Sequence, residues 1–580
     1  MPRKALYLAL SVLALGGCAT TDRDDTMPSL PSETVNVVTD PEPVDQQPAP
    51  EGSFRPEELY LLLAGEIAAQ RGQYDVTLAN YVEAARQSGD VGVIRRALLI
   101  AESLNSQSAV RTLTNTWIEA APYSQDARRA AAIQSLRDGD MEATLTELEQ
   151  ILNLGGDADF DSLAAMAPQL PEDQQQELLR LFDELQERHP DNPEIRYSTA
   201  LLQNLTGSPG QALETLEPLT GEEPEFQPAL VLRGELLYEL GRTTEALQHL
   251  QTSARRYPDN RQLRTLYARI LVSENELRAA QDEFAELVER FPEEHGLRLS
   301  WALVAIENGE LDLAREQLQR LARLPQYQGQ AYYYLGQVAE KAGNDDQAIT
   351  LYDQVSDGPL YYPALTRSAE LRARDGDLES ALARIRSARE SNPGDAARLW
   401  LAEVNLLQAL DRHEQAVAAA SEGLLAYPGD QSLLYARSMS HEKLGNIEQS
   451  LDDLNTMVEL TPDNPTALNA LGYVMTIHTE RLDEARGYIE RALELDPDNP
   501  AILDSMGWVL YRQGDTAGAL DYLRNAYEIY PDPEIAAHYG EVLWHTGEKA
   551  QARVVWERAL DEAPDHELLL ETLDRLGVDL

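Results

Sequence analysis

A stretch near the C-terminus repeats itself, and this repetition constrains the fold more than any other feature of the chain. Gly472, Gly507 and Gly540 lie 35 and 33 residues apart. In each block alanines recur at two later offsets, and the block ends at a proline. In block order, these residues are Ala485, Ala519 and Ala552, then Ala492, Ala526 and Ala559, then Pro497, Pro531 and Pro564. Such a period predicts stacked helical units, none of which buries its apolar face alone.

Each block predicts a helix, a tight turn and a second helix. The small residues at shared offsets allow two helices to approach closely, and Gly514 and Gly547 supply the positive φ that ends the first helix. A proline cannot continue a helix, so it ends the second one. This arrangement resembles the tetratricopeptide repeat, which implies an all-α solenoid wound as a right-handed superhelix of about 13–15 helix pairs.

The same marks occur upstream with varying clarity. Gly65 and Gly72 mark a first block, the marks then fade, and they return after the middle of the N-terminal half. We therefore expect partly degenerate helical repeats over residues 55–190 and a repeat array over residues 191–564. Residues 565–580 are expected to form a last helix that covers the open end of the solenoid.

The first residues form a targeting segment rather than part of the fold. Basic Arg3 and Lys4 precede a short apolar run, which ends just before Cys18, the only cysteine of the chain. Residues 1–17 resemble a bacterial lipoprotein signal peptide, which implies cleavage before Cys18 and lipidation of its sulfur. Ala19, rather than an acidic residue, follows, which in that family implies the outer membrane and a periplasmic orientation. An ordinary secretory signal with an incidental cysteine is the alternative.

Residues 18–54 have the composition of a tether. Proline and acidic residues dominate, and large apolar residues are almost absent. Such a segment buries too little surface to offset the entropy lost on ordering, so we expect it to be disordered.

The charge of the chain excludes one class of partner. Ninety-nine acidic residues face 48 basic ones, and the formal net charge is −51. Binding to nucleic acid requires a basic surface, so we expect none. A well-solvated surface and the attraction of a basic partner both remain open as reasons for the charge.

The repeat predicts a binding groove, because in this family the first helix of each pair lines the concave surface. Aromatic rings there accept apolar side chains, and amides pair with the backbone of an extended peptide. Packing of these rings between helix pairs is the alternative. The residues expected in the groove are Tyr333, Gln337, Asn405, Gln408, Tyr435, Asn469, Tyr473, Asp504, Trp508, Tyr511, Glu541 and Trp544.

No catalytic motif is present in the sequence. There is no nucleophile elbow, phosphate-binding loop or zinc-protease helix motif. His538, Glu541 and His545 share one helix face, so a zinc site can be drawn, but groove-lining histidines are far commoner. We therefore expect neither an enzyme nor a metal or other cofactor.

A closer resemblance covers the signal, the tether and the array, and is most specific over residues 464–564. It is carried by ALNALGY at 467–473, RLDEA at 481–485 and PAILDSMGWVLYR at 500–512. It continues through YPDPE at 530–534 and AHYGEVLW at 537–544. These segments resemble long tetratricopeptide lipoproteins of gammaproteobacteria, similar to a Pseudomonas lipoprotein that binds a periplasmic carboxyl-terminal processing protease.

The resemblance implies a non-catalytic adaptor on the outer membrane. It would bring the protease together with peptidoglycan hydrolases as substrates, and so limit cleavage of the cell wall. Protease contacts are implied near the N-terminal helices, where Leu59, Tyr60, Leu63 and Tyr74 are the candidates, although core packing explains them equally well. A general peptide-binding or assembly scaffold, for outer-membrane biogenesis or polysaccharide export, is the alternative function.

Overall fold

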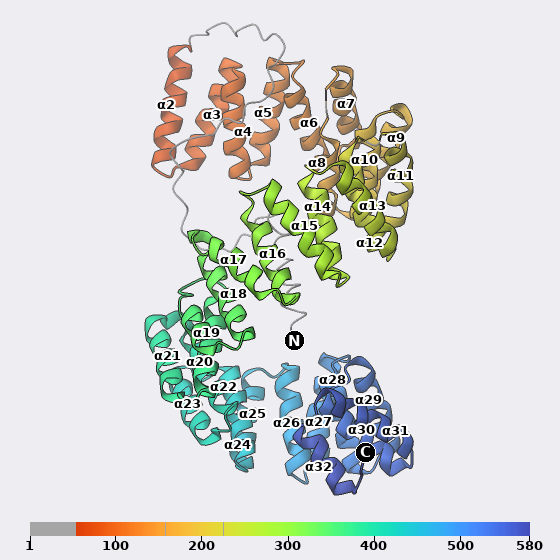
Figure 1. Cartoon of the computed structure of the whole chain (residues 1–580). Helices are drawn as coiled ribbons and strands as arrows, with labels where there is room; N and C mark the ends of the chain where they lie inside the picture. The colour runs from red at the N-terminus through yellow and green to blue at the C-terminus, as the bar shows by residue number, and fades with distance from the viewer. Residues whose placement is uncertain (1–53, 157, 224) are drawn as a thin grey trace. The chain divides into compact units, whose positions relative to one another are not determined.

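A computed structural model describes residues 54–580 apart from residues 157 and 224. The predicted signal peptide, Cys18 and nearly all of the predicted tether lie outside these residues. The described residues form thirty-one α-helices, α2 to α32, with three short 3₁₀ segments and no strand (Figure 1). The all-α repeat solenoid predicted from the sequence is confirmed, at about fifteen helix pairs. Within this part of the chain, no helix combines the length and the apolar character needed to cross a bilayer.

The helices belong to two compact units, which divide after Gln317, inside α17 (Leu311–Leu321). The first unit contains α2 (Pro56–Gln70), α3 (Tyr74–Ser88), α4 (Val91–Ser103), α5 (Gln107–Ala120), α6 (Gln125–Arg137), α7 (Met141–Asn153), α8 (Phe160–Ala165), η1 (Ala167–Gln169), α9 (Glu172–Arg188), α10 (Pro193–Leu205), α11 (Pro209–Glu222), α12 (Gln227–Glu239), α13 (Thr243–Arg256), α14 (Arg261–Ser273), α15 (Leu277–Arg290) and α16 (His295–Glu307).

The second unit begins within α17 and contains the repeats with the clearest sequence marks. Its elements are η2 (Pro325–Tyr327), α18 (Gln328–Lys341), α19 (Asp345–Tyr352), α20 (Tyr361–Arg374), α21 (Leu378–Ser391), η3 (Pro393–Asp395), α22 (Ala396–Gln408), α23 (His413–Ala426), α24 (Gln431–Lys443), α25 (Ile447–Leu460), α26 (Pro465–His478), α27 (Leu482–Leu495), α28 (Pro500–Gln513), α29 (Thr516–Ile529), α30 (Pro533–Thr546), α31 (Lys549–Glu562) and α32 (Glu567–Leu576).

The turn chemistry read from the sequence sets the helix boundaries. Gly514 and Gly547 end α28 and α30 with φ of +93° and +94°, as predicted. The second helices α27, α29 and α31 end two residues before their block's proline. At the other end, the side chain of Asp532 accepts a hydrogen bond from the backbone N–H of Glu534 and so caps α30.

The first glycine of each C-terminal block lies where two helices touch. A Cβ atom on Gly507 would lie 2.5 Å from Cγ of Leu523, and one on Gly540 would collide with Nε1 of Trp556. Nothing larger than hydrogen fits at these positions, which confirms the predicted close approach. Fixed helix spacing in turn fixes which side chains meet along the array.

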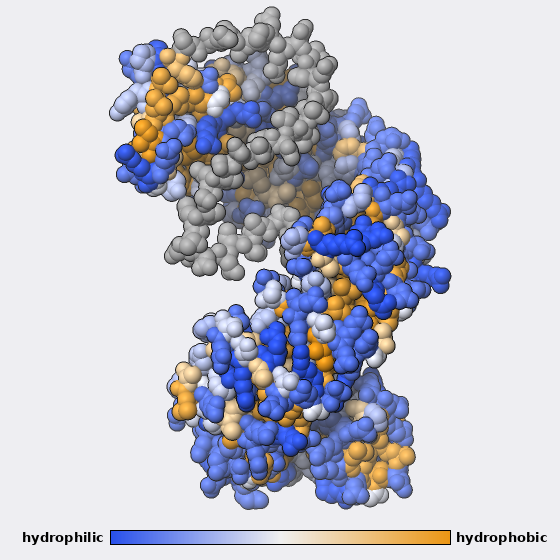
Figure 2. Space-filling view, turned by 60° about the vertical axis from the view of Figure 1, so that its left-hand side comes forward, coloured by the Kyte–Doolittle hydropathy of each residue, from blue (hydrophilic) through white to orange (hydrophobic). Residues whose placement is uncertain are grey.

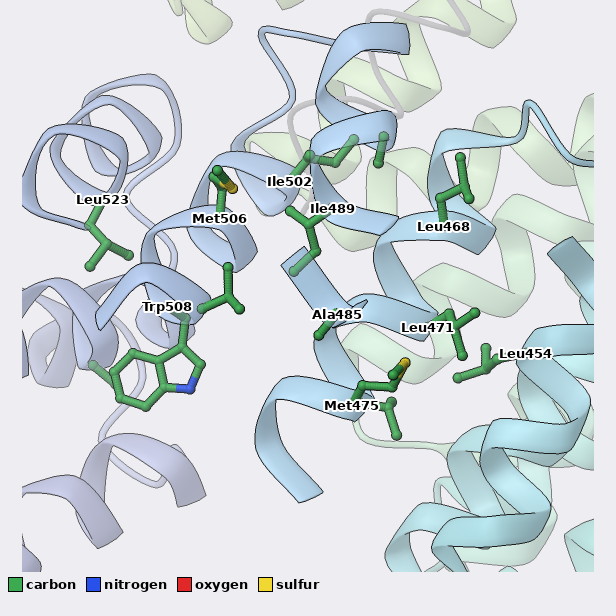
Figure 3. Packing of buried hydrophobic residues seen from close by; sticks show 14 of the residues in the cluster. Leu454, Leu468, Leu471, Met475, Ala485, Ile489, Ile502, Met506, Trp508 and Leu523 are labelled. Carbon is green, nitrogen blue, oxygen red and sulfur yellow. The ribbon is translucent and has the colours of Figure 1, made fainter. Parts of the chain in front are cut away.

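One continuous core runs from α22 to α32 in the second unit. In Figure 3, Leu471 and Met475 of α26 face Leu454 of α25 on one side, while Ile489 of α27 lies toward Ile502 of α28 on the other. The core therefore passes from each helix to the next without interruption.

The regular pattern of helix pairs breaks once in the first unit. Between α7 and α9 the chain forms only the six-residue helix α8 and the 3₁₀ turn η1. Asp159, before α8, has a φ of +56°. Among residues other than glycine, aspartate adopts this left-handed backbone conformation more readily than most. The weak repeat marks in this part of the sequence thus coincide with a real irregularity.

Candidate protein-binding surfaces

Several predicted groove residues meet at one place in the second unit. The phenol of Tyr473 in α26 donates a hydrogen bond to Oε1 of Glu534 in α30 at 2.5 Å. The ring of Trp508 in α28 stacks on His538 of α30, with 4.0 Å between ring centres. We define the polar-aromatic cluster as Tyr435, Tyr473, Asp504, Trp508, Glu534 and His538, from α24, α26, α28 and α30.

A buried ion pair lies at the centre of this cluster. Nδ1 of His538 donates to Oδ2 of Asp504 at 2.9 Å, and the two side chains are almost fully buried. Burial by itself lowers the pKa of His538, but the Asp504 carboxylate outweighs it, so the pKa lies above its ordinary value. The imidazole is therefore held toward its charged form in the folded protein.

The surroundings of the cluster are acidic. Burial, Glu534 and Asp504 together raise the pKa of the Tyr473 phenol. Burial, Glu442 and Glu534 raise the pKa of Tyr435 in the same direction. A negative potential contributes to both shifts, because it disfavours a phenolate anion. The same potential favours basic side chains on a partner.

Beyond the cluster, the predicted groove residues nearest the C-terminus are held by internal contacts. Glu541 is only 3% exposed, and its Oε1 accepts a hydrogen bond at 2.9 Å from Arg575 of α32. The phenol of Tyr511 contacts Nδ1 of His545 at 3.1 Å. The ring of Trp544 is half-buried and lies 4.4 Å from Nζ of Lys549. A peptide would have to break these contacts before using the side chains.

The predicted groove residues differ widely in how accessible they are. Trp508 and Asp504 are buried, whereas Asn405 is exposed and Tyr435 is 39% exposed. Gln337 and Asn469 are half-buried, Gln408 donates to the carbonyl oxygen of Ala436 at 2.7 Å, and Tyr333 packs on Tyr352 at 5.6 Å. A binding role for the whole set stays a prediction, and Tyr435 and Asn405 are its most accessible members.

The residues drawn as a possible zinc site are engaged elsewhere. His538 pairs with Asp504, and Glu541 pairs with Arg575. Across the described ranges, no three histidine, cysteine or acidic residues are grouped as metal ligands.

The sequence did not predict three contacts that organise this surface. They are Glu534 with Tyr473, Arg575 with Glu541, and His538 with Asp504. A signal was available, because Asp504 and His538, and likewise Glu541 and Arg575, are 34 residues apart. One repeat length places equivalent residues of neighbouring first helices side by side. Searching the sequence for opposite charges at that offset finds both pairs.

A second candidate surface lies on α2 at the beginning of the first unit. Leu59, Leu63 and Ile67 are 49%, 55% and 49% exposed, and Tyr60 is 70% exposed. Leu59, Leu63 and Ile67 are spaced four residues apart, and Tyr60 directly follows Leu59, so together they form an apolar stripe along one side of the helix. Figure 2 shows apolar side chains gathered at this end of the first unit. We call these four residues the α2 stripe.

The other side of α2 packs on α3. A Cβ atom on Gly65 would lie 2.9 Å from Cδ2 of Tyr81, so the two helices touch there. Tyr74, the remaining predicted contact residue, begins α3 and is 37% exposed. Core packing was the alternative explanation for Leu59, Tyr60 and Leu63, and their exposure in this unit shows that they are not core residues.

Comparisons with known proteins agree with this architecture. Family models described as tetratricopeptide repeat match residues 205–270, 237–299, 299–359, 463–532 and 510–574. TPR repeat-containing protein PA4667 of Pseudomonas aeruginosa is 40% identical over 538 residues, which covers 93% of this chain and 90% of that protein.

Solved structures are similar at lower identity. The thermophilic TPR protein TTC0263 of Thermus thermophilus is 23% identical, with a TM-score of 0.29, over 32% of this chain and 100% of that chain. A chain of the Cut9–Hcn1 heterotetramer of the APC/C is 15% identical, with a TM-score of 0.32, over 89% of this chain and 96% of that chain.

The tetratricopeptide repeat is typically a non-catalytic scaffold for protein interactions, which agrees with the surfaces described above. The chain belongs to the family of tetratricopeptide-repeat proteins that includes PA4667.

Proposed function

We propose that this protein is a non-catalytic scaffold, anchored to the outer membrane by lipid on Cys18 and facing the periplasm. It binds a carboxyl-terminal processing protease and delivers peptidoglycan hydrolases to it as substrates. Holding both on one molecule raises the effective concentration of substrate at the protease, to the millimolar range for short flexible links.

The α2 stripe is the observation that supports the protease contact. Four large apolar side chains, each about half exposed or more, lie along α2, the first helix that the structure describes. A contiguous, exposed apolar stripe on the surface of a folded protein is typical of a protein-interaction site. Helix α2 has one face on α3 and leaves this one for a partner.

The charge of the chain supports the choice of substrates. The net charge of −51 and the acidic surroundings of Tyr435 and Tyr473 favour partners with basic surfaces. Hydrolases that act on an anionic cell wall are suited to such a surface if they are themselves basic.

The proposal is tested by affinity purification of the full-length lipidated protein from detergent-solubilised membranes. We expect a carboxyl-terminal processing protease and cell-wall hydrolases to be recovered together. The protease should then degrade those hydrolases faster when this protein is added. Recovery of outer-membrane assembly or export components without any protease would instead support a general assembly scaffold.

We expect Leu63→Asp in the α2 stripe to weaken binding of the protease about 30-fold. An apolar side chain at the centre of an interface contributes about 2 kcal/mol or more to binding, and replacing it by a charged one removes this contribution, which corresponds to about 30-fold in affinity. Thermal stability should stay unchanged, because the side chain is 55% exposed. Val554→Asp is the matched control, since Val554 in α31 is 64% exposed and lies in the other unit. Equal weakening by both variants would contradict a contact at α2.

We expect Tyr435→Ala to weaken binding of the hydrolases about fivefold to tenfold while leaving the protease affinity unchanged. Tyr435 is the accessible aromatic ring of the polar-aromatic cluster, and aromatic rings dominate binding hot spots. Binding to each partner can be measured separately by biolayer interferometry. Tyr530→Ala is the control, because Tyr530 is 58% exposed and lies outside the cluster. Unchanged hydrolase affinity would remove Tyr435 from the binding surface.

A further inference from the structure

A cavity of about 290 Å³ lies between α4, α5 and α6 in the first unit. These three helices lie next to one another in Figure 1. Helix α5 packs on both neighbours, but α4 and α6 do not pack closely on each other. One face of α5 therefore lines the space between them. The cavity is at the small end of the range for ligand-binding pockets.

Three polar side chains line this cavity without a hydrogen-bond partner. Oγ1 of Thr114, Nε1 of Trp117 and both amide atoms of Gln134 are buried and unpaired within the described protein. The three residues are only 2%, 7% and 5% exposed. Leaving a buried polar group unpaired destabilises the folded state, so native structures normally satisfy such groups. Several of them around one cavity indicate a ligand.

The remaining lining supplies an apolar wall and a basic rim. Arg95 and Arg137 are exposed at the rim, and the guanidinium of Arg95 lies 6.0 Å from the ring centre of Trp117. Among the carboxylates there, Asp126 is already paired with Arg129 at 2.9 Å. Only Glu102 remains to offset two arginines, which is unusual in a chain with a net charge of −51. The apolar wall consists of Leu98, Leu99, Val110, Ala130 and Ile133.

The donor and acceptor pattern identifies the chemistry of the ligand. Indole Nε1 only donates, the threonine hydroxyl and the glutamine NH₂ also donate, and the arginines add positive charge. This set matches a carboxylate, which only accepts. Among the buried unpaired atoms, the Gln134 carbonyl is the one acceptor that cannot act as a donor, so the ligand should also carry an N–H group. The apolar wall requires an apolar side chain close to both.

The last residue of a polypeptide carries all three groups: a free carboxylate, a backbone N–H and a side chain. We propose that this cavity binds the free carboxyl terminus of a partner polypeptide that ends in an apolar residue. The inference rests on the proposed function only in taking the ligand to be a protein. A cation is disfavoured by the arginines, and a neutral apolar molecule would leave the donors unpaired.

The experiment uses the whole purified protein and fluorescein-labelled Gly-Ser peptides that end in leucine. We expect saturable binding of the peptide with a free carboxyl terminus, followed by fluorescence anisotropy. Amidation of the terminus, or replacement of the leucine by aspartate, should weaken binding about tenfold or more. Equal affinity of the amidated peptide would overturn the proposal. Tighter binding of decanoate, which has a carboxylate but no N–H, would show that the site takes a free acid instead.

Gln134→Leu separates a binding role from a structural one. We expect this variant to lose at least about tenfold in peptide affinity while its melting temperature stays the same or rises, because an unpaired buried amide is removed. Gln107→Leu is the matched control, since Gln107 is exposed on α5 outside the cavity lining. Unchanged affinity in Gln134→Leu would mean that water alone satisfies these groups. Leu63→Asp should leave peptide binding intact, so failure of the proposed protease contact and failure of this site are distinguishable.

Discussion

Replacing Gly472 by alanine is expected to destabilise the C-terminal repeats by about 3 kcal/mol, at the upper end of the cost of overpacking a core. The new methyl group would lie 2.5 Å from Cγ1 of Ile489 and 2.8 Å from the backbone oxygen of Ala485. Ile489 can change its side-chain conformation, but the backbone oxygen belongs to helix α27. The two helices must therefore separate, and the buried contacts between them weaken along the whole pair.

Gly487→Ala is the matched control for this prediction. Gly487 lies within the same helix pair, but a Cβ atom there meets nothing within 4 Å. Alanine in a helix interior is favoured over glycine, so we expect this variant to be more stable by about 0.5–1 kcal/mol. Hydrogen exchange of α26 and α27 measures both changes locally, which suits a repeat array better than a single melting transition. Equal protection in the two variants would contradict close packing at Gly472.

The elements that depend on local chemistry could be read from the sequence. The positive φ of Gly514 and Gly547, the close approach at Gly507 and Gly540, and the ends of α27, α29 and α31 follow from residue types at fixed offsets. Each of these requires only that one residue type satisfies one backbone or packing demand. A short period repeated many times then extends those local rules to the whole array.

Side-chain partners were harder to predict because they depend on which neighbours share a surface. Trp508 was expected to line a groove, but its ring is stacked on His538 and only 8% exposed. The distance in sequence from the first-helix glycine predicts on which face of the helix a residue lies. It does not predict how deeply the side chain is buried. Residues one repeat apart decide that depth, as Asp504 does for His538.

The cavity in the first unit was also beyond sequence reasoning. Thr114 and Gln134 are polar residues on helices, and such residues are usually solvated. Their burial depends on how α4, α5 and α6 pack together, which no single residue type reports. The α2 stripe shows the opposite case. Leu59 and Leu63 are residue types that are usually buried, but they lie exposed on the first described helix.

Replacing His538 by leucine is expected to destabilise α28 and α30 by about 3–5 kcal/mol, because it leaves the buried Asp504 carboxylate without its partner. Asp504 is 4% exposed, so water cannot take the place of the imidazole without opening the helices. The double variant Asp504→Leu with His538→Leu should recover most of the loss, since two apolar side chains can replace a buried ion pair at little cost. The free energies of local opening can be compared in a double-mutant cycle by hydrogen exchange.

The same pair predicts how stability depends on pH. Burial alone would lower the pKa of His538, but Asp504, with Glu534 and Glu541, raises it above its ordinary value of 6.5. The folded state therefore binds this proton more tightly than the unfolded state does. The stabilisation is fully present below pH 6.5 and is lost as the pH rises through the higher folded-state value. Local opening of α28 and α30 should thus become easier between neutral and alkaline pH in the wild-type protein, but not in the double variant. Stability that instead fell toward acidic pH in this range would mean that His538 is buried in its neutral form.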